Sequence, residues 1–163
     1  MSKLTTIKVN TERNIAGITA SISTSLNPMD AGTEDLIICS WVMQSSYNDG
    51  EVVINIDGDR PIYSLIQKAG IFTISVLGID NLDEAAVCAL SREERKEKLG
   101  SLNLGRTADD IPYLNNSLAY FECNYTDSVK MKNNVLLVGT PVDGEILSEG
   151  ESLTLHDYYK LLG

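Results

Sequence analysis

The chain has 163 residues, 43% of them hydrophobic, which is long enough for one domain with a buried core of its own. Its 13 lysine and arginine residues stand against 23 aspartate and glutamate residues, so the net charge is -10. This charge repels phosphate backbones and anionic membrane surfaces. We therefore predict a single domain over residues 1–163 whose partners include neither nucleic acid nor membrane.

The cysteine and histidine pattern argues against a metal site. Cys39, Cys88 and Cys123 are widely spaced, no CxxC motif occurs, and the chain has one histidine. Neither a disulfide framework nor a Cys/His zinc site fits this pattern. The first residues contain no apolar leader segment, and no apolar run approaches the roughly 18 residues of a membrane span. These features predict a cytoplasmic protein.

The first third of the chain has the composition of β-strands. Residues 15–25 alternate between apolar and hydroxyl side chains, which is the period of a half-buried strand. Residues 36–46 predict a second, longer strand that ends before the turn sequence at 48–50. Residues 51–57 predict a third strand from their valine and isoleucine content.

The hydrophobic period then changes to that of a helix. From Ile62 onward, apolar residues recur at i, i+3, i+4 and i+7. Pro61 occupies a first-turn position and Gly70 a stop position, so residues 60–69 predict a short helix. Residues 71–78 return to strand composition.

Charged residues dominate the next segment. Residues 81–98 predict one broken helix or two, with capping-box spacing, and their tail SREERKEK predicts a solvated helix face. A glycine-containing connector at 100–112 follows. Further strands are expected at 118–126, 135–143 and 152–156, with a loop at 132–134.

This order of elements favours an antiparallel barrel or sandwich. Strands outnumber helices, and no regular alternation of strand and helix occurs. No GxGxxG or GxxxxGK[ST] motif supports a doubly wound nucleotide-binding fold.

Several stretches, in this order, resemble the flavin reductase-like family. Residues 35–50, DLIICSWVMQSSYNDG, resemble its N-G-M-T-A-S-W-x-x-Q-V-S-F-D-P-P stretch, and EVVINIDGDRPIYSLIQKAGIFTISVL resembles the strand, turn, helix and strand that follow. Shorter matches occur at 111–114 (I-P-x-L), 118–123 (A-x-L-E-C) and 135–139 (L-F-V-G), and at the terminal YKLLG (Y-x-x-L-G). The resemblance covers nearly the whole chain.

The resemblance implies a mainly β fold, an FMN-binding split β-barrel with short helical decorations. It also implies a homodimer that binds FMN, with FAD as the less favoured cofactor, in a groove near the subunit interface. The flavin would carry the chemistry, so no catalytic side chain is expected. The residues that would line the flavin ring and its ribityl chain are Cys39, Ser40, Trp41 and Ser46. The turn that would hold the phosphate side consists of Asp57, Gly58, Asp59 and Arg60.

Arg60 is the strongest single candidate for the phosphate. A phosphate needs several donors that converge, and a turn leading into the helix at 60–69 offers free backbone N–H groups and the positive end of the helix dipole. The guanidinium of Arg60 adds a charge-assisted donor.

Three stretches of the chain depart from the family pattern. Ile38 replaces a threonine and Ser75 replaces an asparagine. Lys132-Asn133-Asn134 replaces G-D-H, whose histidine is associated with nicotinamide use. Two functions remain open: an FMN-dependent oxidoreductase reduced by NAD(P)H or by a redox protein partner, and a split-barrel ligand-binding protein without flavin turnover.

Individual side chains also allow ordinary structural roles. Trp41 fits a core anchor as well as a ligand wall. Cys39 is expected to be a small packing residue that allows close approach of the flavin, rather than a redox centre. His156 is expected at the surface or at an interface. One of Tyr158 and Tyr159 is expected in the core, with packing over the site or the dimer seam as the other use of this pair.

Overall fold

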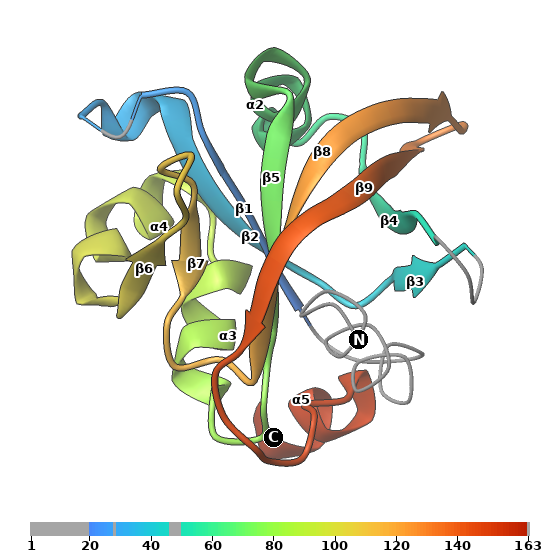
Figure 1. Cartoon of the computed structure of the whole chain (residues 1–163). Coiled ribbons are helices and arrows are strands. Elements are labelled where there is room, and N and C mark those ends of the chain that lie inside the picture. Colours follow the sequence, from blue (N-terminus) through green and yellow to red (C-terminus); the bar gives the residue numbers. More distant parts are fainter. Residues whose placement is uncertain (1–19, 28, 46–49, 163) are drawn as a thin grey trace.

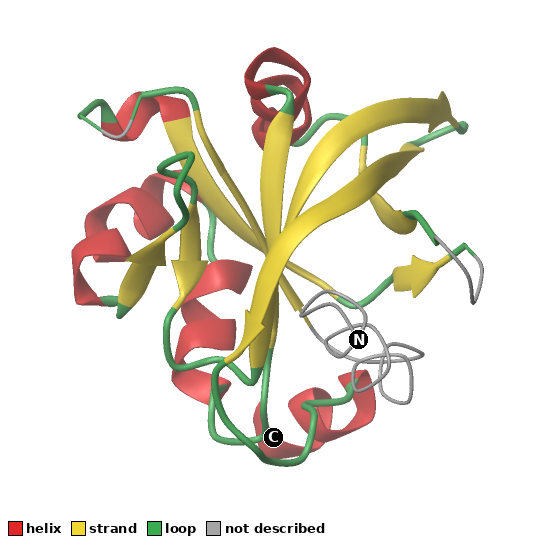
Figure 2. Cartoon of the chain, viewed as in Figure 1, coloured by secondary structure: helices red, strands yellow, loops and turns green. Residues whose placement is uncertain are grey.

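The computed structural model describes residues 20–27, 29–45 and 50–162, and it consists mainly of β-strands (Figures 1 and 2). A seven-stranded antiparallel sheet contains β1 (Ala20–Ser25), β2 (Glu34–Cys39), β3 (Val42–Gln44), β4 (Val52–Asp57), β5 (Ile71–Val76), β8 (Ala119–Lys130) and β9 (Asn134–Ile146). A separate hairpin contains β6 (Leu104–Arg106) and β7 (Pro112–Leu114). The helices are α2 (Pro61–Ala69), α3 (Leu82–Ala89), α4 (Arg92–Lys98) and α5 (Leu155–Leu162), with short 3-10 turns η1 (Ala31–Thr33) and η2 (Leu99–Ser101).

The sheet curls into a barrel that closes at Ser40 and Trp41. Its strand order is β2-β1-β5-β8-β9-β4-β3, so the two edge strands follow one another in the sequence. The chain therefore passes from one edge of the sheet to the other at Ser40 and Trp41. There the Asn55 N–H donates to the Trp41 carbonyl at 2.9 Å. The predicted mainly β barrel is confirmed.

The barrel interior is filled by apolar side chains from the strands and from α2. The members that are 2% exposed or less include Ile22, Ile37, Ile54, Ile62, Ile66, Phe72, Ile74 and Leu137. Gly139 on β9 makes room for the Phe72 ring, because a Cβ at position 139 would lie 2.5 Å from Phe72 Cζ. A side chain at that position would displace the ring.

Helix α2 matches its prediction closely. Pro61 occupies its first turn, and Gly70 ends it in the left-handed conformation with φ of 72°. Glycine adopts this conformation without the steric cost that a Cβ brings. Ile62, Tyr63 and Ile66 are buried in the barrel core, which fixes the start of α2 relative to the end of β4.

A second apolar cluster lies outside the barrel and corrects the prediction for the first strand. The cluster consists of Leu36, Leu77, Ala85, Cys88, Leu114, Leu153 and Tyr158. The hydroxyl face of β1 lies on this outer side and is buried too, since Ser21 and Ser23 have no exposed surface. Ser21 Oγ lies 3.6 Å from Cys88 Sγ of α3. The first strand is therefore buried on both faces, and its predicted residues 15–19 lie outside the described part of the chain.

The predicted strand at 36–46 is in fact two strands with different neighbours. Cys39 of β2 pairs with Ala20 of β1, whereas Val42 of β3 pairs with Ile54 of β4. One continuous strand could not serve both neighbours, because barrel closure requires the chain to change edges between them. The predicted turn at 48–50 lies outside the described residues except for Gly50.

Three further predictions about local structure need correction. The candidate strand at 152–156 forms isolated bridges at Ser152 and Thr154 instead of a strand, the first of them to Gly78, and α5 begins at Leu155. The connector at 100–112 contains β6 and the first residue of β7. The tail of the 81–98 segment is not wholly solvated, because Arg95 is 3% exposed. That segment forms two helices, α3 and α4. Among all the helices of the described residues, none is long and apolar enough to cross a membrane.

Candidate functional site

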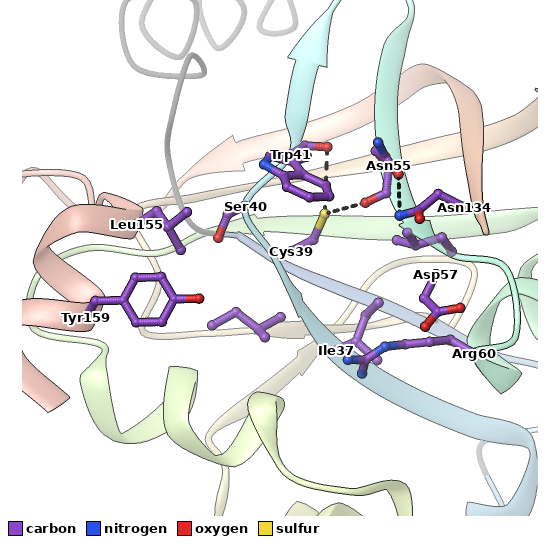
Figure 3. A pocket seen from close by; sticks show the side chains of 12 residues that line it. Ile37, Cys39, Ser40, Trp41, Asn55, Asp57, Arg60, Asn134, Leu155 and Tyr159 are labelled. Carbon is purple, nitrogen blue, oxygen red and sulfur yellow. Dashed lines mark hydrogen bonds between the residues drawn. The ribbon is translucent and has the colours of Figure 1, made fainter. Parts of the chain in front are cut away.

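A cavity of about 340 Å³ lies where the barrel closes (Figure 3). The residues that line it are Ile37, Ile38, Cys39, Ser40, Trp41, Asn55, Ile56, Asp57, Arg60, Asn134, Leu155 and Tyr159. They come from the end of β2, the crossing after it, β4, the turn before α2, the start of β9, and α5. The closure of the barrel thus creates the cavity.

The cavity has a charged end and an aromatic end. Figure 3 shows Asp57 and Arg60 at one end, and Leu155 and Tyr159 at the other. Trp41 is 62% exposed and Tyr159 is 66% exposed, although both are aromatic. Because neither ring is buried in the barrel core, both are available to a ligand at the cavity. The interpretation of Trp41 as a core anchor is therefore wrong.

Arg60 is held by the backbone at the start of α2. It is the N-cap residue of the helix in an extended conformation, with φ of -68° and ψ of 129°, and its N–H donates to the Asp57 carbonyl at 3.1 Å. Among the described residues the arginine ion pairs involve Arg92, Arg95 and Arg106, and none involves Arg60. Its guanidinium is thus available to an anion, beside the positive end of a helix.

Cys39 packs at the inner wall of the cavity. It is 6% exposed, and its Sγ donates to the carbonyls of Asn55 at 3.5 Å and Trp41 at 3.7 Å. Burial raises the pKa of the Cys39 thiol, and the hydrogen bonds to the Trp41 and Asn55 carbonyls, followed by the positive charge of Arg60, oppose that shift only in part. A thiol of this kind is a poor nucleophile at neutral pH. The burial of Cys39 confirms its predicted packing, and the close approach of a flavin to it stays a prediction.

Two asparagine side chains form a linked pair on the strand wall. Asn134 Nδ2 donates to Asn55 Oδ1 at 2.9 Å, across the β4–β9 pairing. Each amide keeps further donor or acceptor capacity, because a primary amide has two N–H groups and two acceptor lone pairs. The pair therefore offers both donors and acceptors to a polar ligand, and neither amide titrates near neutral pH.

The structure brings five of the eight predicted site residues to this cavity: Cys39, Ser40, Trp41, Asp57 and Arg60. Gly58 and Asp59 line a neighbouring cavity instead. Since the turn passes between the two cavities, its residues divide between them. Ser46 lies outside the described residues.

Sequence reasoning missed Asn55, Ile37, Ile56 and Leu155 as lining residues. Asn55 carried a usable signal, because it is a polar residue within the apolar strand EVVINID. Asn134 was noted as a departure from the family pattern, and the structure places it at the cavity. Tyr158 is buried and Tyr159 lines the cavity, so the prediction that one of the two packs in the core is confirmed. His156 is exposed, as expected.

The cavity suits a flat ligand with an anionic end. Its volume lies within the range of small-molecule sites, about 300–1,000 Å³. Isoleucine side chains and two aromatic rings offer contact to a ring system, polar groups lie along one wall, and Arg60 offers a charge-assisted donor. Among the described residues, no group of three or more His, Cys, Asp or Glu side chains could hold a metal ion.

Comparison with known proteins gives one family match and distant curated relatives. The family model described as "Flavin reductase like domain" matches residues 4–160. The chain is 28% identical over 144 residues to the putative diflavin flavoprotein A 2 of Synechocystis sp.. That match covers 86% of this chain and 25% of the relative, so the chain spans about a quarter of the relative's length.

Solved structures show the same fold at lower sequence identity. A flavin reductase domain protein from Arthrobacter sp. FB24 superimposes with a TM-score of 0.73 at 17% sequence identity. The superposition covers 90% of this chain and 87% of the chain of that protein. Flavoredoxin from Methanosarcina acetivorans gives a TM-score of 0.68 at 16% identity, with 81% of this chain and 68% of its own covered. The barrel is therefore shared with proteins whose sequences have diverged widely.

Proposed function

Because the chain belongs to the flavin reductase-like domain family, we propose that it is an oxidoreductase that binds FMN in the cavity at the barrel closure. The observation that carries this proposal is the position of Arg60. Its guanidinium has no ion-pair partner in the described part of the chain and lies at the charged end of a cavity that also contains an aromatic end. FMN has one ring system and one phosphate, which matches these two ends.

Each part of the cavity has a distinct task in this proposal. When bound, the flavin supplies the electron or hydride chemistry. Arg60 and the first turn of α2 bind the phosphate, while Ile37 and Ile56 contact apolar surface of the ligand. Asn55 and Asn134 orient its polar edge through their amide groups. Buried Cys39 keeps the inner wall narrow and unreactive.

Visible absorbance and fluorescence test the proposal directly. Purified protein mixed with FMN should retain flavin absorbance after gel filtration. FMN should also quench the fluorescence of Trp41, which is the chain's single tryptophan and lines the cavity. The variant Trp41→Phe should lose the quenching signal but keep the bound absorbance. Absence of flavin uptake by the wild-type protein would overturn the proposal.

The electron donor is a second part of the proposal. Asn134 occupies the position where the family pattern has a histidine. An amide side chain does not gain or lose a proton near neutral pH, so Asn134 cannot transfer a proton during reduction of the flavin. NAD(P)H and a reduced protein partner are both compatible with the cavity. Anaerobic mixing of the FMN-loaded protein with NADH and NADPH separates them, because bleaching of the flavin absorbance identifies the nucleotide route.

We also propose that the active form is a homodimer with the cavity near the subunit interface. Trp41, Met43 and Tyr159 are more than half exposed, at 62%, 56% and 66%, and β3 is an edge strand of the described sheet. Exposed apolar side chains beside an open strand edge favour association with a second copy.

The buried thiols Cys39 and Cys88 support a reducing compartment such as the cytoplasm.

Light scattering after gel filtration tests the dimer. The wild-type protein should have the mass of two chains, and Met43→Lys should shift it toward one chain by placing a charge in the interface. Met29→Lys is the matched control, because Met29 is 93% exposed and lies in the turn before η1. A wild-type protein with the mass of one chain, with or without FMN, would contradict the proposed dimer.

A further inference from the structure

Glu122 is a buried carboxyl group on the outer face of the sheet. It lies on β8 and is 3% exposed, and it points away from the barrel core that its neighbours Phe121 and Cys123 help to fill. No ion pair of the described residues includes it, and its Oε2 atom is buried without a hydrogen-bond partner there. A buried carboxylate with an unpaired oxygen is costly, so a neutral acid is the more stable form at this position.

The β6–β7 hairpin is docked over this region by hydroxyl groups of β5, the strand beside β8. Thr73 Oγ1 donates to the Pro112 carbonyl, and Ser75 Oγ accepts the Leu114 N–H at 3.0 Å. Thr73 is the residue of β5 that pairs with Glu122. The start of β7 is therefore held beside Glu122, and the turn that precedes β7 reaches its carboxyl group.

The β6–β7 turn (residues 107–111) brings a second carboxyl group to the first. The side chains of Thr107 and Asp109 both form hydrogen bonds to Glu122. Two ionised carboxylates have only acceptor atoms, so a hydrogen bond between Asp109 and Glu122 requires a proton on one of them. Because Asp109 is exposed to solvent and Glu122 is buried, Glu122 is the group that keeps the proton.

The groups that face Glu122 leave a negative charge on it uncompensated. The titratable side chains on the elements packed against it are Arg106, Asp109, Asp110 and Tyr113 of the hairpin, and Asp143 and Glu145 of β9. Strand β5 adds none. The cation among them, Arg106, is engaged with Glu34, since its Nη1 and Nη2 donate to the two carboxylate oxygens at 2.6 Å and 2.9 Å. Arg106 is therefore not free to pair with Glu122.

The surroundings of Glu122 raise its pKa. Burial is the largest cause, the hydrogen bond from Thr107 opposes it in part, and the negative charges of Asp109 and Asp143 add to the rise. Tyr120 lies on the same face of β8 and adds no charge at neutral pH, because burial raises its pKa to about 12. Electrostatics and hydrogen-bond geometry thus both favour a protonated Glu122.

We propose that Glu122 and Asp109 share one proton, and that this proton holds the β6–β7 turn on the sheet. With the proton bound, the Glu122 hydroxyl donates to the Asp109 carboxylate. When the proton leaves, no donor remains between the two carboxylates, and Asp143, which pairs with Glu122 from β9, adds a third negative charge. The turn then separates from β8, so the carboxyl pair makes closure of this turn dependent on pH. None of these residues lines the cavity at the barrel closure, so the inference does not rest on the proposed function.

The hairpin is built so that its turn can move while its other end stays fixed. Leu114 at the end of β7 has no exposed surface and packs in the second apolar cluster. Within the turn, Asp110 adopts the left-handed backbone conformation with φ of 65°, which is uncommon for a residue with a Cβ. The turn therefore depends on its contacts with β8 to keep this conformation.

Amide hydrogen exchange of the full chain, followed by NMR at several pH values, tests the carboxyl pair. The Ile111 N–H donates to Thr107 Oγ1 at 3.2 Å, and Thr107 in turn contacts Glu122, so the Ile111 amide reports on the closed turn. Opening releases the shared proton. The protection factor of this amide, corrected for intrinsic exchange, should be highest below the ordinary glutamate pKa of about 4.3. It should then fall by up to about tenfold per pH unit until the raised pKa of Glu122, and level off above it.

A matched pair of variants isolates the proton. Glu122→Gln keeps a donor for Asp109 but cannot ionise, so the protection factor of Ile111 should lose its pH dependence. Asp110→Asn is the control, because it removes a negative charge from the same turn without touching the pair, and asparagine tolerates the left-handed conformation. This control should keep the pH dependence of the wild type. An equal pH dependence in Glu122→Gln would overturn the proposal.

A carbon-13 NMR titration of the side-chain carboxyl groups tests the pair without a change at Glu122, and so decides the matter even if Glu122→Gln does not fold. In the wild-type protein Glu122 should titrate above about 4.3. Asp109→Asn should lower this pKa, because the amide donates to the ionised carboxylate and a negative charge is lost, whereas Asp110→Asn should change it less. A Glu122 that titrates at or below the ordinary value, or a pKa that Asp109→Asn leaves unchanged, would contradict a shared proton.

Discussion

Replacing Arg60 with alanine is expected to weaken FMN binding by about 1.5–3 kcal/mol, which is the usual loss for a hydrogen bond to a charged group. This loss corresponds to a rise in Kd of about 10- to 150-fold. The guanidinium lines the cavity and has no ion-pair partner among the described residues. Because Arg60 is partly exposed, solvent screening places the expected loss toward the lower end of that range. Quenching of Trp41 fluorescence measures the Kd.

Two companion variants separate the charge of Arg60 from its shape and from general effects on α2. Arg60→Lys keeps the charge but loses the two parallel donors, so its affinity should fall between those of the wild type and Arg60→Ala. Lys68→Ala removes an exposed charge from the last turn of the same helix and should leave the Kd unchanged. An unchanged Kd in Arg60→Ala would contradict the assignment of the phosphate to this residue.

Replacing Asp35 with alanine is expected to lower the free energy of unfolding by about 3–5 kcal/mol, the cost of leaving a buried charge without its partner. Asp35 lies on β2, and Arg95 lies on α4. Arg95 Nη2 donates to Asp35 Oδ1 at 2.9 Å and to Oδ2 at 3.0 Å, and Arg95 Nε donates to Oδ1 at 3.1 Å. Both side chains are 3% exposed, so solvent cannot replace the lost carboxylate. Urea unfolding at neutral pH measures the change.

Matched variants show whether the loss comes from the unpaired arginine. In Asp35→Leu/Arg95→Met both charges are removed, and the double variant should be more stable than Asp35→Ala, since apolar replacement of a buried pair is often tolerated. Glu93→Ala on the exposed side of α4 should change the unfolding free energy by less than about 0.5 kcal/mol. A loss below about 1 kcal/mol in Asp35→Ala would contradict this account of the ion pair.

Local sequence patterns predicted those elements that are stabilised by local interactions. Helix α2 followed from an apolar stripe, with Pro61 at its start and Gly70 at its end, and these residues act within one or two turns of the backbone. The long hairpin of β8 and β9 followed from two β-rich runs around Lys132-Asn133-Asn134. In both cases the signal and the structure lie within a few residues of each other.

Predictions failed where distant parts of the chain decide the outcome. The hydroxyl face of β1 was expected in solvent, yet α3 covers it through the contact between Cys88 and Ser21. The break between β2 and β3 was invisible, because residues 36–46 have a continuous strand composition. Helix α5, in contrast, was missed although it had a local signal, because Thr154 caps its first turn by accepting the Asp157 N–H at 3.0 Å.

The sequence by itself determined the class of the fold and the family, because periodicity, turn residues and motif order are properties of the chain. It also identified Arg60 and Trp41 as candidates. Only the tertiary structure decided that the cavity forms at Ser40 and Trp41, and that Asn55, Asn134 and Tyr159 lie beside it. The physical reason is that a barrel closes by hydrogen bonds between strands far apart in sequence, so the walls of its cavity are assembled from segments with no local signal in common.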